Sequence, residues 1–433
     1  MSAPETKPVP TAGGRRMSPD ARRAQIIASA RDVFLRHGFV GTRVRDIAEQ
    51  AGITENLIYI RFSTKAEIYQ AAVTDPLDAL VDQLVEATSQ LSAEPGANRL
   101  RMFERFHQVL LSSMLDTAPL LAVALFSNPV DGRRYYSEVV LPRFTEAITT
   151  VISDVTGWPL DSLQLDVLVE GVLGLHFGMA LDSIFDERTV DVPDVARQLG
   201  IMFGSGIVAR PGAIDPVTPA EPAPAAVTES ETDPDIDTEP RVRMQAAERR
   251  ASIARAAREV FVERGPAGAR TREIAERAGI TEAFMFRVFG GKEELYRAAV
   301  EEPAEALLAR LEADIREATS RGGSGTETLR AVNERGIAVF SELAPIVVVA
   351  LFSDMHRGRA FYRRSVNPLF RRVQTYLAGV AGWDTSDVDP EILWRALFGI
   401  QFGTVLHHLL TEHPIDAADT ARRLTRLIAA GIR

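Results

Sequence analysis

Cysteine is absent from the 433 residues of the chain, and lysine occurs only at Lys7, Lys65 and Lys292. The absence of cysteine excludes disulfide scaffolds, zinc fingers, iron–sulfur sites and thiol nucleophiles. Arginine therefore supplies 46 of the 49 basic residues. Such a bias is typical of coding in a GC-rich bacterial genome, so the abundance of arginine alone says little about binding.

Long apolar runs are also absent. The longest, such as residues 344–352, fall far short of the about 20 residues that a membrane helix needs. Residues 1–17 contain no apolar segment of the kind found in a secretory signal. No Gly-rich phosphate loop, nucleophile elbow or catalytic carboxylate pair occurs. We therefore expect a cytoplasmic protein that is not an enzyme and has no cofactor or metal.

The formal net charge of −10 conceals two basic segments. Residues 211–240 carry eight acidic and no basic residues, which accounts for −8 of the total. Residues 15–69 carry ten basic and six acidic residues, and residues 241–296 carry twelve basic and eight acidic residues, so each segment has a charge of +4. Two local basic regions in an acidic background are typical of a protein that binds nucleic acid.

The chain repeats itself over more than 200 residues. Residues 24–73 align without a gap on residues 251–300, and 25 of these 50 positions are identical. The similarity continues downstream, where residues 118–127 parallel 344–353 and residues 174–178 parallel 399–403. A period of this length indicates a duplicated domain, since the repeats of a solenoid are far shorter.

A Pro-rich, acidic segment separates the two copies and has too few bulky apolar residues to order itself. The predicted parts are a disordered tail (1–19), a first DNA-binding domain (20–69), a first ligand-binding and dimerisation domain (70–210), a linker (211–240), a second DNA-binding domain (241–296) and a second ligand-binding and dimerisation domain (297–433).

Each copy is predicted to be all-α, with about nine helices. Apolar residues recur at helical spacing, as in Ile26, Ala30 and Val33, and Gly38 follows as a helix stop. Period-2 alternation and Asn-Gly turns, which would indicate strands and hairpins, are absent.

Residues 42–62 predict a helix-turn-helix. Arg43–Ala51 forms a first short helix, Gly52 supplies the tight turn, and Thr54 is a good N-cap for a second helix over Glu55–Arg61. The small core between the helices is expected to contain Ile47, Ala48, Ala51, Ile53, Ile58 and Phe62. The second copy repeats the pattern over residues 270–289, with Gly279 at the turn and Thr281 at the cap. Such a unit places its second helix in the major groove of DNA, although similar corners also occur in purely structural bundles.

This segment resembles the DNA-binding domain of the TetR family of bacterial transcription regulators. The residues that carry the resemblance are Phe34, Gly38, Thr42, Asp46, Ile47, Ala48, Ala51, Gly52, Ile53, Thr54, Tyr59, Phe62, Lys65 and Ile68. The remainder of each copy resembles the family more loosely. The resemblance implies two all-α units, each with a helix-turn-helix domain followed by a helical ligand-binding and dimerisation domain.

The resemblance also implies roles for residues of the first copy. Thr42, Tyr59 and Lys65 would bond DNA phosphates, while Thr54, Glu55, Asn56 and Ile60 would lie near base edges. Asn56 is the preferred base reader, because an amide pairs with adenine through two hydrogen bonds. Arg43 and Arg45 begin the first short helix and are expected to face phosphates. Arg61 is also expected to contact DNA. The alternative for Tyr59 is a core aromatic with its hydroxyl at the rim.

The second copy departs from the pattern. Alanine replaces Thr42 (at Ala269) and Asn56 (at Ala283), and Phe286 replaces Tyr59 and so lacks its hydroxyl. The positions still expected to contact DNA are Arg270, Thr271, Arg272, Thr281, Arg287 and Lys292. We expect this copy to bind DNA more weakly, to read a different half-site, or to serve partly as scaffold.

In the family the remaining helices bind a ligand, and the last two pair with those of a partner in a four-helix bundle. The matching pairs here are residues 163–186 with 192–209 and residues 390–411 with 417–432, and glycines at close-packing spacing occur in both. The ligand-site candidates are Phe103, His107, Met114, Phe126, Tyr136, His176 and Phe177 in the first copy, and Phe340, Phe352, His356, Tyr362, Trp394 and Gln401 in the second. For most of these residues, ordinary core is the favoured alternative. Adjacent His407 and His408 point to different helix faces, so surface or interface positions are expected there rather than a metal site.

The combined prediction is a regulator that binds double-stranded DNA, most simply a repressor released by a small apolar effector. The two copies would pair within one chain as a pseudo-dimer on an operator with unequal half-sites. An intermolecular dimer with four reading heads remains an alternative arrangement. The alternative function is a ligand-sensing or protein-interaction module whose DNA binding has decayed.

Overall fold

The computed structural model describes residues 17–92, 99–156, 162–205 and 238–430. The predicted tail and linker lie almost entirely outside these residues. The described chain is helical without a β-strand, which confirms the all-α prediction. We call residues 17–205 unit 1 and residues 238–430 unit 2.

The two units contain the same succession of helices. Unit 1 comprises α1 (Pro19–Gly41), α2 (Val44–Ala51), α3 (Glu55–Tyr59), α4 (Lys65–Tyr69), η1 (Gln70–Thr74), α5 (Asp75–Ser92), α6 (Arg99–Phe126), α7 (Pro129–Tyr135), η2 (Tyr136–Val140), α8 (Leu141–Thr156), α9 (Ser162–Asp186) and α10 (Val192–Ser205). Unit 2 comprises α11 (Thr238–Gly268), α12 (Thr271–Arg277), α13 (Glu282–Phe289), α14 (Lys292–Tyr296), η3 (Arg297–Glu301), α15 (Glu302–Ser320), α16 (Gly325–Phe352), α17 (Met355–Phe361), η4 (Tyr362–Val366), α18 (Asn367–Leu377), α19 (Pro390–Thr411) and α20 (Ala417–Ala430). Among the described residues each unit thus has ten α-helices, close to the predicted nine, and π-helical turns join two pairs of them end to end.

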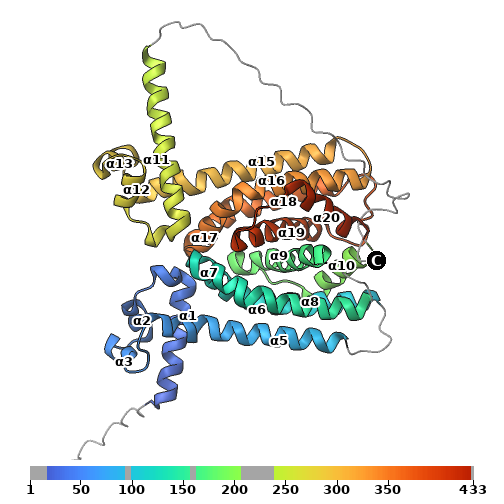
Figure 1. The fold of residues 1–433 in the computed structure, drawn as a ribbon, viewed down its shortest axis with the longest axis horizontal. Helices are drawn as coiled ribbons and strands as arrows, with labels where there is room; N and C mark the ends of the chain where they lie inside the picture. Colours follow the sequence, from blue (N-terminus) through green and yellow to red (C-terminus); the bar gives the residue numbers. More distant parts are fainter. Residues whose placement is uncertain (1–16, 93–98, 157–161, 206–237, 431–433) are drawn as a thin grey trace, which may run out of the picture.

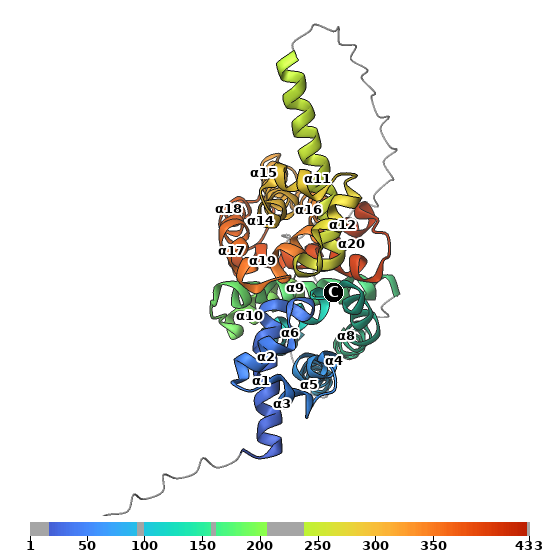
Figure 2. The same cartoon turned by 90° about the vertical axis from the view of Figure 1, so that its left-hand side faces the viewer.

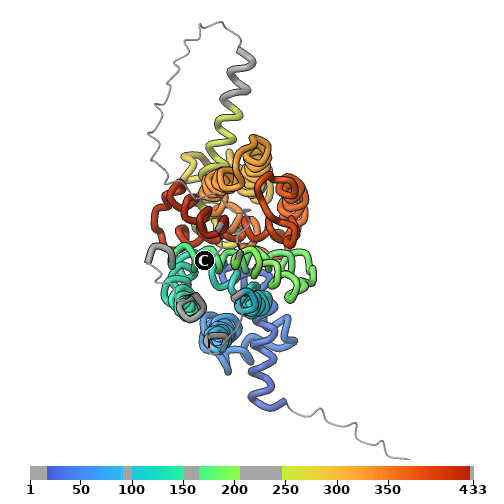
Figure 3. The backbone as a smooth tube through the Cα atoms, turned by 90° about the vertical axis from the view of Figure 1, so that its right-hand side faces the viewer, coloured from blue at the N-terminus to red at the C-terminus, as the bar shows by residue number. Residues whose placement is uncertain are grey.

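The units stack on one another, with their first helices on one side of the molecule. In Figure 1 the long helices of unit 1 lie below those of unit 2, and α1–α3 and α11–α13 gather at the left. Figure 2 faces that side, and Figure 3 views the opposite one, where the long helices of both units lie. We call α1–α4 head 1 and α11–α14 head 2.

Helices α9 and α19 form the main contact between the units. Glycine allows this close approach. A Cβ built on Gly174 would collide with the carbonyl oxygen of Gly399 and lie 2.5 Å from the Cα of Gly403. A Cβ on Gly178 would lie 2.7 Å from the Cα of Gly399. The contact runs from backbone to backbone, so no larger residue fits without displacing a helix.

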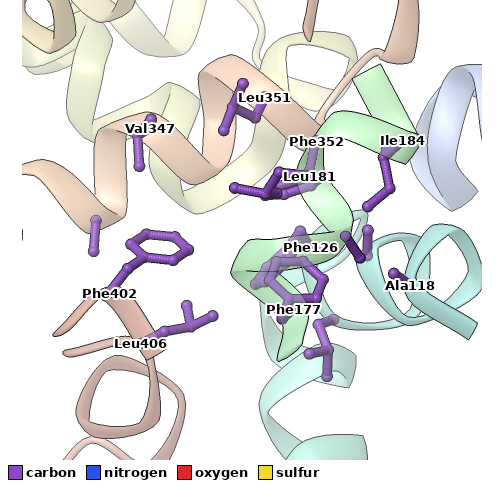
Figure 4. Close-up of a cluster of buried hydrophobic side chains, with 14 of the residues drawn as sticks. Ala118, Phe126, Phe177, Leu181, Ile184, Val347, Leu351, Phe352, Phe402 and Leu406 are labelled. Atoms are coloured by element: carbon purple, nitrogen blue, oxygen red, sulfur yellow. The ribbon is translucent and has the colours of Figure 1, made fainter. Parts of the chain in front are cut away.

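Aromatic side chains extend this contact into a core that both units share. Phe126 of α6 stacks on Phe352 of α16 with ring centroids 4.8 Å apart. Phe177 and Phe185 of α9 lie 5.7 and 5.4 Å from the Phe352 ring. Figure 4 shows Phe126, Phe177, Leu181 and Phe352 converging between the units.

Three helices are long and apolar enough to cross a membrane, by length and composition alone: Leu100–Phe126, Leu165–Asp186 and Gly325–Phe352. The expectation that no segment approaches this length was wrong, because it considered only uninterrupted apolar runs. The most apolar window of Leu165–Asp186 is 94% buried inside the protein, and those of the other two helices are 67% buried. Their apolar residues therefore largely serve the packing of this fold.

Candidate DNA interface

Head 1 contains the predicted helix-turn-helix. Gly52 ends α2 in the left-handed conformation (φ 64°, ψ 35°), which favours glycine over residues with a Cβ. The side chains of Ile47, Ala48, Ala51, Ile58 and Phe62 are all buried, as predicted for the core between the helices. Ile53 is only partly buried and packs against this core. The local sequence therefore predicted both the turn and the packing.

Helix α3, the second helix of the helix-turn-helix, and the residues that flank it present their remaining side chains to solvent. Thr54, Glu55, Asn56 and Arg61 are exposed. Tyr59 is 49% and Ile60 67% exposed, which disfavours the alternative of Tyr59 as a core aromatic. Exposed apolar groups on a short helix can contact thymine methyl groups in the major groove.

Leu57 belongs to this surface and was missed as a site residue. It is 41% exposed on α3, beside Asn56. The sequence did not indicate its exposure, because an apolar residue next to Ile58 is expected in the core until the direction of each side chain is known.

The side chains of Thr42 and Lys65 form hydrogen bonds within head 1 rather than project freely from it. Thr42 is buried, and its hydroxyl donates to the Gly38 carbonyl at 2.7 Å. The Lys65 Nζ donates to the carbonyls of Phe39 (2.8 Å) and Thr42 (2.9 Å). Burial lowers the pKa of Lys65. The predicted phosphate contact of Thr42 is therefore corrected, because its hydroxyl is inside the protein. Lys65 keeps one N–H beyond these two bonds, so a phosphate contact there stays a prediction.

The two predicted phosphate-facing arginines lie at the open start of α2. Arg43 is exposed immediately before the helix. Arg45 is exposed as well and forms an ion pair of 2.7 Å with Glu49. The equivalent arginines of head 2 have the same setting, because Arg270 precedes α12 and Arg272 pairs with Glu276 at 2.8 Å. Both heads therefore expose the same cationic pair.

The reading helix of head 2 differs in its polar groups. Thr281 caps α13 by accepting from the Phe284 amide at 3.2 Å. Thr271 donates to Glu282 at 2.5 Å, so its hydroxyl is already engaged. Arg287 is exposed and lies over the Phe284 ring at 4.7 Å. Lys292 donates to the Ala269 carbonyl at 2.6 Å, as Lys65 does to Thr42. Head 2 thus keeps the cations and the internal lysine but offers fewer free hydrogen-bonding groups.

Tyr59 and Phe286 occupy equivalent exposed positions and permit a reciprocal test. Tyr59→Phe should weaken binding to every DNA sequence about tenfold, since a hydrogen bond to a charged phosphate is lost. Phe286→Tyr should strengthen binding by a similar factor, because Phe286 is 38% exposed at the position equivalent to Tyr59 and the substitution adds the missing hydroxyl. Titration of the wild-type and both variant chains with one duplex measures both effects. Unchanged affinity for Tyr59→Phe would remove the hydroxyl from the interface.

The ligand-site candidates of unit 1 include a buried histidine pair. The His107 Nδ1 lies 3.1 Å from the His176 Nε2, and the His176 Nδ1 lies 2.7 Å from the Val172 carbonyl. Burial lowers the pKa of His107 well below its ordinary value and lowers the pKa of His176 to about 4, so both rings are neutral near pH 7. The carbonyl requires a proton on His176 Nδ1, so His107 Nδ1 donates and His107 Nε2 is left as a buried acceptor without a protein partner.

Unit 2 has an amide pair at the corresponding place. The Gln401 side-chain amide donates to the Asn333 oxygen at 2.8 Å, and Asn333 donates to Thr425 at 3.0 Å. The Gln401 Oε1 is buried without a partner. The sequence analysis did not name Asn333 as a site residue, because its role is suggested only by its alignment with His107 of unit 1.

The other ligand-site candidates are dispersed. Phe126, Tyr136 and Phe177 line a cavity of about 20 Å³ beside α19, enough for a water-sized group. Buried core positions are occupied by Phe103, Met114, Phe340, Phe352, Tyr362 and Trp394. His356 is exposed on α17, so its assignment to a pocket was wrong.

Known proteins resemble this chain over parts that each cover less than half of its length. The model of the family "Bacterial regulatory proteins, tetR family" matches twice, over residues 26–72 and 253–299. The transcriptional activator FasR of Mycolicibacterium smegmatis is 34% identical over 196 residues, which span 45% of this chain and 85% of that protein. YfiR of Bacillus subtilis, an uncharacterised regulator, is 25% identical and covers 41% of this chain and 88% of its own length.

Similar solved structures include the fatty acid degradation regulator FadR from Bacillus halodurans (16% identity, TM-score 0.36, 43% of this chain and 96% of that one). A regulator from Rhodococcus is 20% identical (TM-score 0.34, 43% and 96%). On the twofold family match and the extent of the likeness to FasR, this chain belongs to the TetR family of bacterial transcription regulators and carries the TetR unit twice.

Proposed function

We propose that this DNA-binding regulator acts in the cytoplasm as a single-chain pseudo-dimer on an operator with two unequal arms. The observation that carries the proposal is the contact between α9 and α19, where glycines of unit 1 meet glycines of unit 2 without intervening side chains. These helices are the ones that pair between subunits in the family. Thirty-odd residues join the units, and such a tether raises the effective concentration to about the millimolar range.

The position of the heads supports two-arm binding. Both heads lie on the same side of the molecule (Figure 2). Helices α1 and α11 touch, and a Cβ built on Gly268 would lie 3.2 Å from Val40. A junction of this kind couples the two heads, so movement of one unit changes the spacing that DNA must match.

We further propose that an apolar effector with a hydrogen-bond donor releases the protein from DNA. The buried acceptors of the His107–His176 and Asn333–Gln401 pairs support such a ligand, since unpartnered buried polar atoms are costly. The effector would favour a head spacing that does not fit the operator. Repression is the simplest outcome of such release, although the relative FasR is named as an activator.

Selection of bound duplexes from a random DNA pool, at near-physiological salt, tests the proposal. The full chain should enrich a motif with two unequal arms. Asn56→Ala should relax discrimination at one base pair of one arm by about 1–3 kcal/mol and leave the other arm unchanged. A motif with a single arm would make head 2 a scaffold. Failure to enrich any motif would favour the ligand-sensing or protein-interaction module, for which the lost hydroxyl at Phe286 is the motivating observation.

A further inference from the structure

Four polar positions surround the glycine contact between α9 and α19. The alignment of Gly174 with Gly399 also aligns Glu170 with Arg395 and Asp182 with His407. The two helices run antiparallel, because Asp182 meets Arg395 at one end and Glu170 meets His407 at the other. Each contact therefore joins position 170 or its equivalent in one unit to position 182 or its equivalent in the other.

The first contact is a buried ion pair. The Arg395 Nη2 lies 2.6 Å from the Asp182 Oδ2, and the two side chains are 7% and 6% exposed. The Tyr362 hydroxyl also donates to Asp182. Arg188 of unit 1 and Glu391 of unit 2 lie alongside, with an ion pair of 2.8 Å between them. A buried charge of this kind is tolerated only with its partner in place.

The second contact joins an acid of unit 1 to an imidazole of unit 2, and both groups are neutral near pH 7, because burial raises the pKa of Glu170 to about 8 and lowers the pKa of His407 to about 4. The His407 Nε2 lies 3.4 Å from the Glu170 Oε1, and the His407 Nδ1 lies 3.0 Å from the Tyr136 hydroxyl. Tyr136 and Tyr362 are equivalent residues, so the same three-residue arrangement occurs at both ends. Here, however, the acidic group comes from position 170 rather than from position 182.

Pairing of like units would destroy both contacts. Two copies of unit 1 would set Glu170 against Asp182 at each end, so Asp182 would lose the Arg395 guanidinium and face a second acid instead. Two copies of unit 2 would set Arg395 against His407, whose imidazole supplies no negative charge. Asp182 and Arg395 each have an ion-pair partner in their own unit as well, Arg188 and Glu391, but only the pairing of unit 1 with unit 2 gives each of the four residues a complementary partner across the contact.

A neighbouring pair of contacts lacks this discrimination. Glu187 pairs with Arg359 at 2.7 Å, and the equivalent Glu412 pairs with Arg133 at 3.1 Å. Both units carry the same charge at each of these positions, so pairs of like units would form these bridges as well. The glycines are also the same in both units. Complementarity that depends on unlike units is found in the buried contacts at positions 170, 182, 395 and 407, and the more exposed Arg363–Asp186 pair adds to it, because the equivalent residues are Ser137 and Thr411.

We infer that Glu170, Asp182, Arg395 and His407 form a pairing code, which makes unit 1 select unit 2 and reject another copy of itself. The inference rests on the proposed pairing through α9 and α19. It adds that these side chains, and not the linker alone, determine which kind of unit each unit pairs with. The code would exclude pairs of like units between two chains, while the linker favours the partner unit in the same chain over that of another chain.

Charge reversal in the full chain tests the code. Arg395→Glu replaces the cation that faces Asp182 with a second acid. In a pair of two unit 2 copies, the same change would supply the Glu–His contact that such a pair lacks. The unfolding temperature should fall by about 10 °C, and the mass measured by light scattering should shift from one chain toward two. Asp182→Arg combined with Arg395→Glu should recover at least half of the lost temperature and the one-chain mass. Full recovery is not expected, because Glu391 and Arg188 remain.

Arg359→Glu is the matched control, because it reverses an arginine of the bridge that does not discriminate. It should lower the unfolding temperature by only a few degrees and leave the mass at one chain. If Arg395→Glu does not fold, Asp182→Asn, Arg395→Met and their combination take its place. The double change should then be less damaging than the sum of the single ones.

The outcomes separate this inference from the proposed function. A one-chain wild type in which Arg395→Glu changes neither the mass nor the unfolding temperature overturns the code and leaves intrachain pairing intact. A two-chain wild type overturns intrachain pairing. The code then stands if the double reversal still rescues Arg395→Glu, and it falls if the double reversal does not.

Discussion

Gly174→Ala is expected to lower the unfolding temperature by about 5–10 °C and to abolish binding to a two-arm operator while single-arm binding persists. The added methyl would meet the backbone of Gly399 and Gly403, which cannot rotate away as a side chain can. Overpacking of a core typically costs about 1–3 kcal/mol, and a contact with backbone lies at the upper end of that range. The units would have to separate along α9 and α19.

Gly171→Ala supplies the matched control on the same helix. Its added Cβ would lie 3.5 Å from the Ile400 side chain, an ordinary van der Waals contact. Because alanine favours a helix over glycine by about 1 kcal/mol, this variant should be unchanged or slightly stabilised. Thermal unfolding and DNA titration of both variants decide the matter. Equal effects of the two substitutions would show that helix propensity, not the approach of the units, governs these positions.

The sequence was a good guide wherever structure depends on neighbouring residues. The turn at Gly52, the cap at Thr281 and the break at Gly38 follow from backbone conformations that few residues favour, so they could be predicted locally. Likewise, the repeat allowed the paired helices to be bounded within a few residues, and the spacing of Gly174 and Gly178 indicated a close approach.

Features that depend on distant residues could not be predicted in this way. The burial of Thr42 depends on how the end of α1 folds over it, and the exposure of His356 depends on which face of α17 meets the core. The Glu170–His407 contact joins residues far apart in the chain, and their charges have meaning only after the units are superposed. His407 was expected at a surface or interface, but its contact with Glu170 was not predicted.

Both heads carry an exposed arginine pair at the start of the first short helix, and this permits a direct comparison of how the two heads use it. Arg43→Ala with Arg45→Ala should weaken binding to the selected operator about 100-fold and lower the slope of log K against log salt by about 1.8, since each lost phosphate contact contributes about 0.9. Arg270→Ala with Arg272→Ala should have a similar effect if head 2 holds DNA through its phosphates. A smaller change in slope would measure how far head 2 has become a scaffold.

Controls distinguish local contacts from net charge. Arg371→Ala with Arg372→Ala removes two exposed arginines from α18, away from the heads, and should leave the slope nearly unchanged. Glu49→Gln should act in the opposite direction, because it removes the carboxylate that holds Arg45 at 2.7 Å and so frees the guanidinium for a phosphate. If the α18 variant lowers the slope as much as the head variants, the dependence on salt reflects the overall field of the protein, and neither arginine pair marks the DNA interface. If only the head 1 pair responds, one reading head holds the operator and unit 2 contributes through the α9–α19 contact alone.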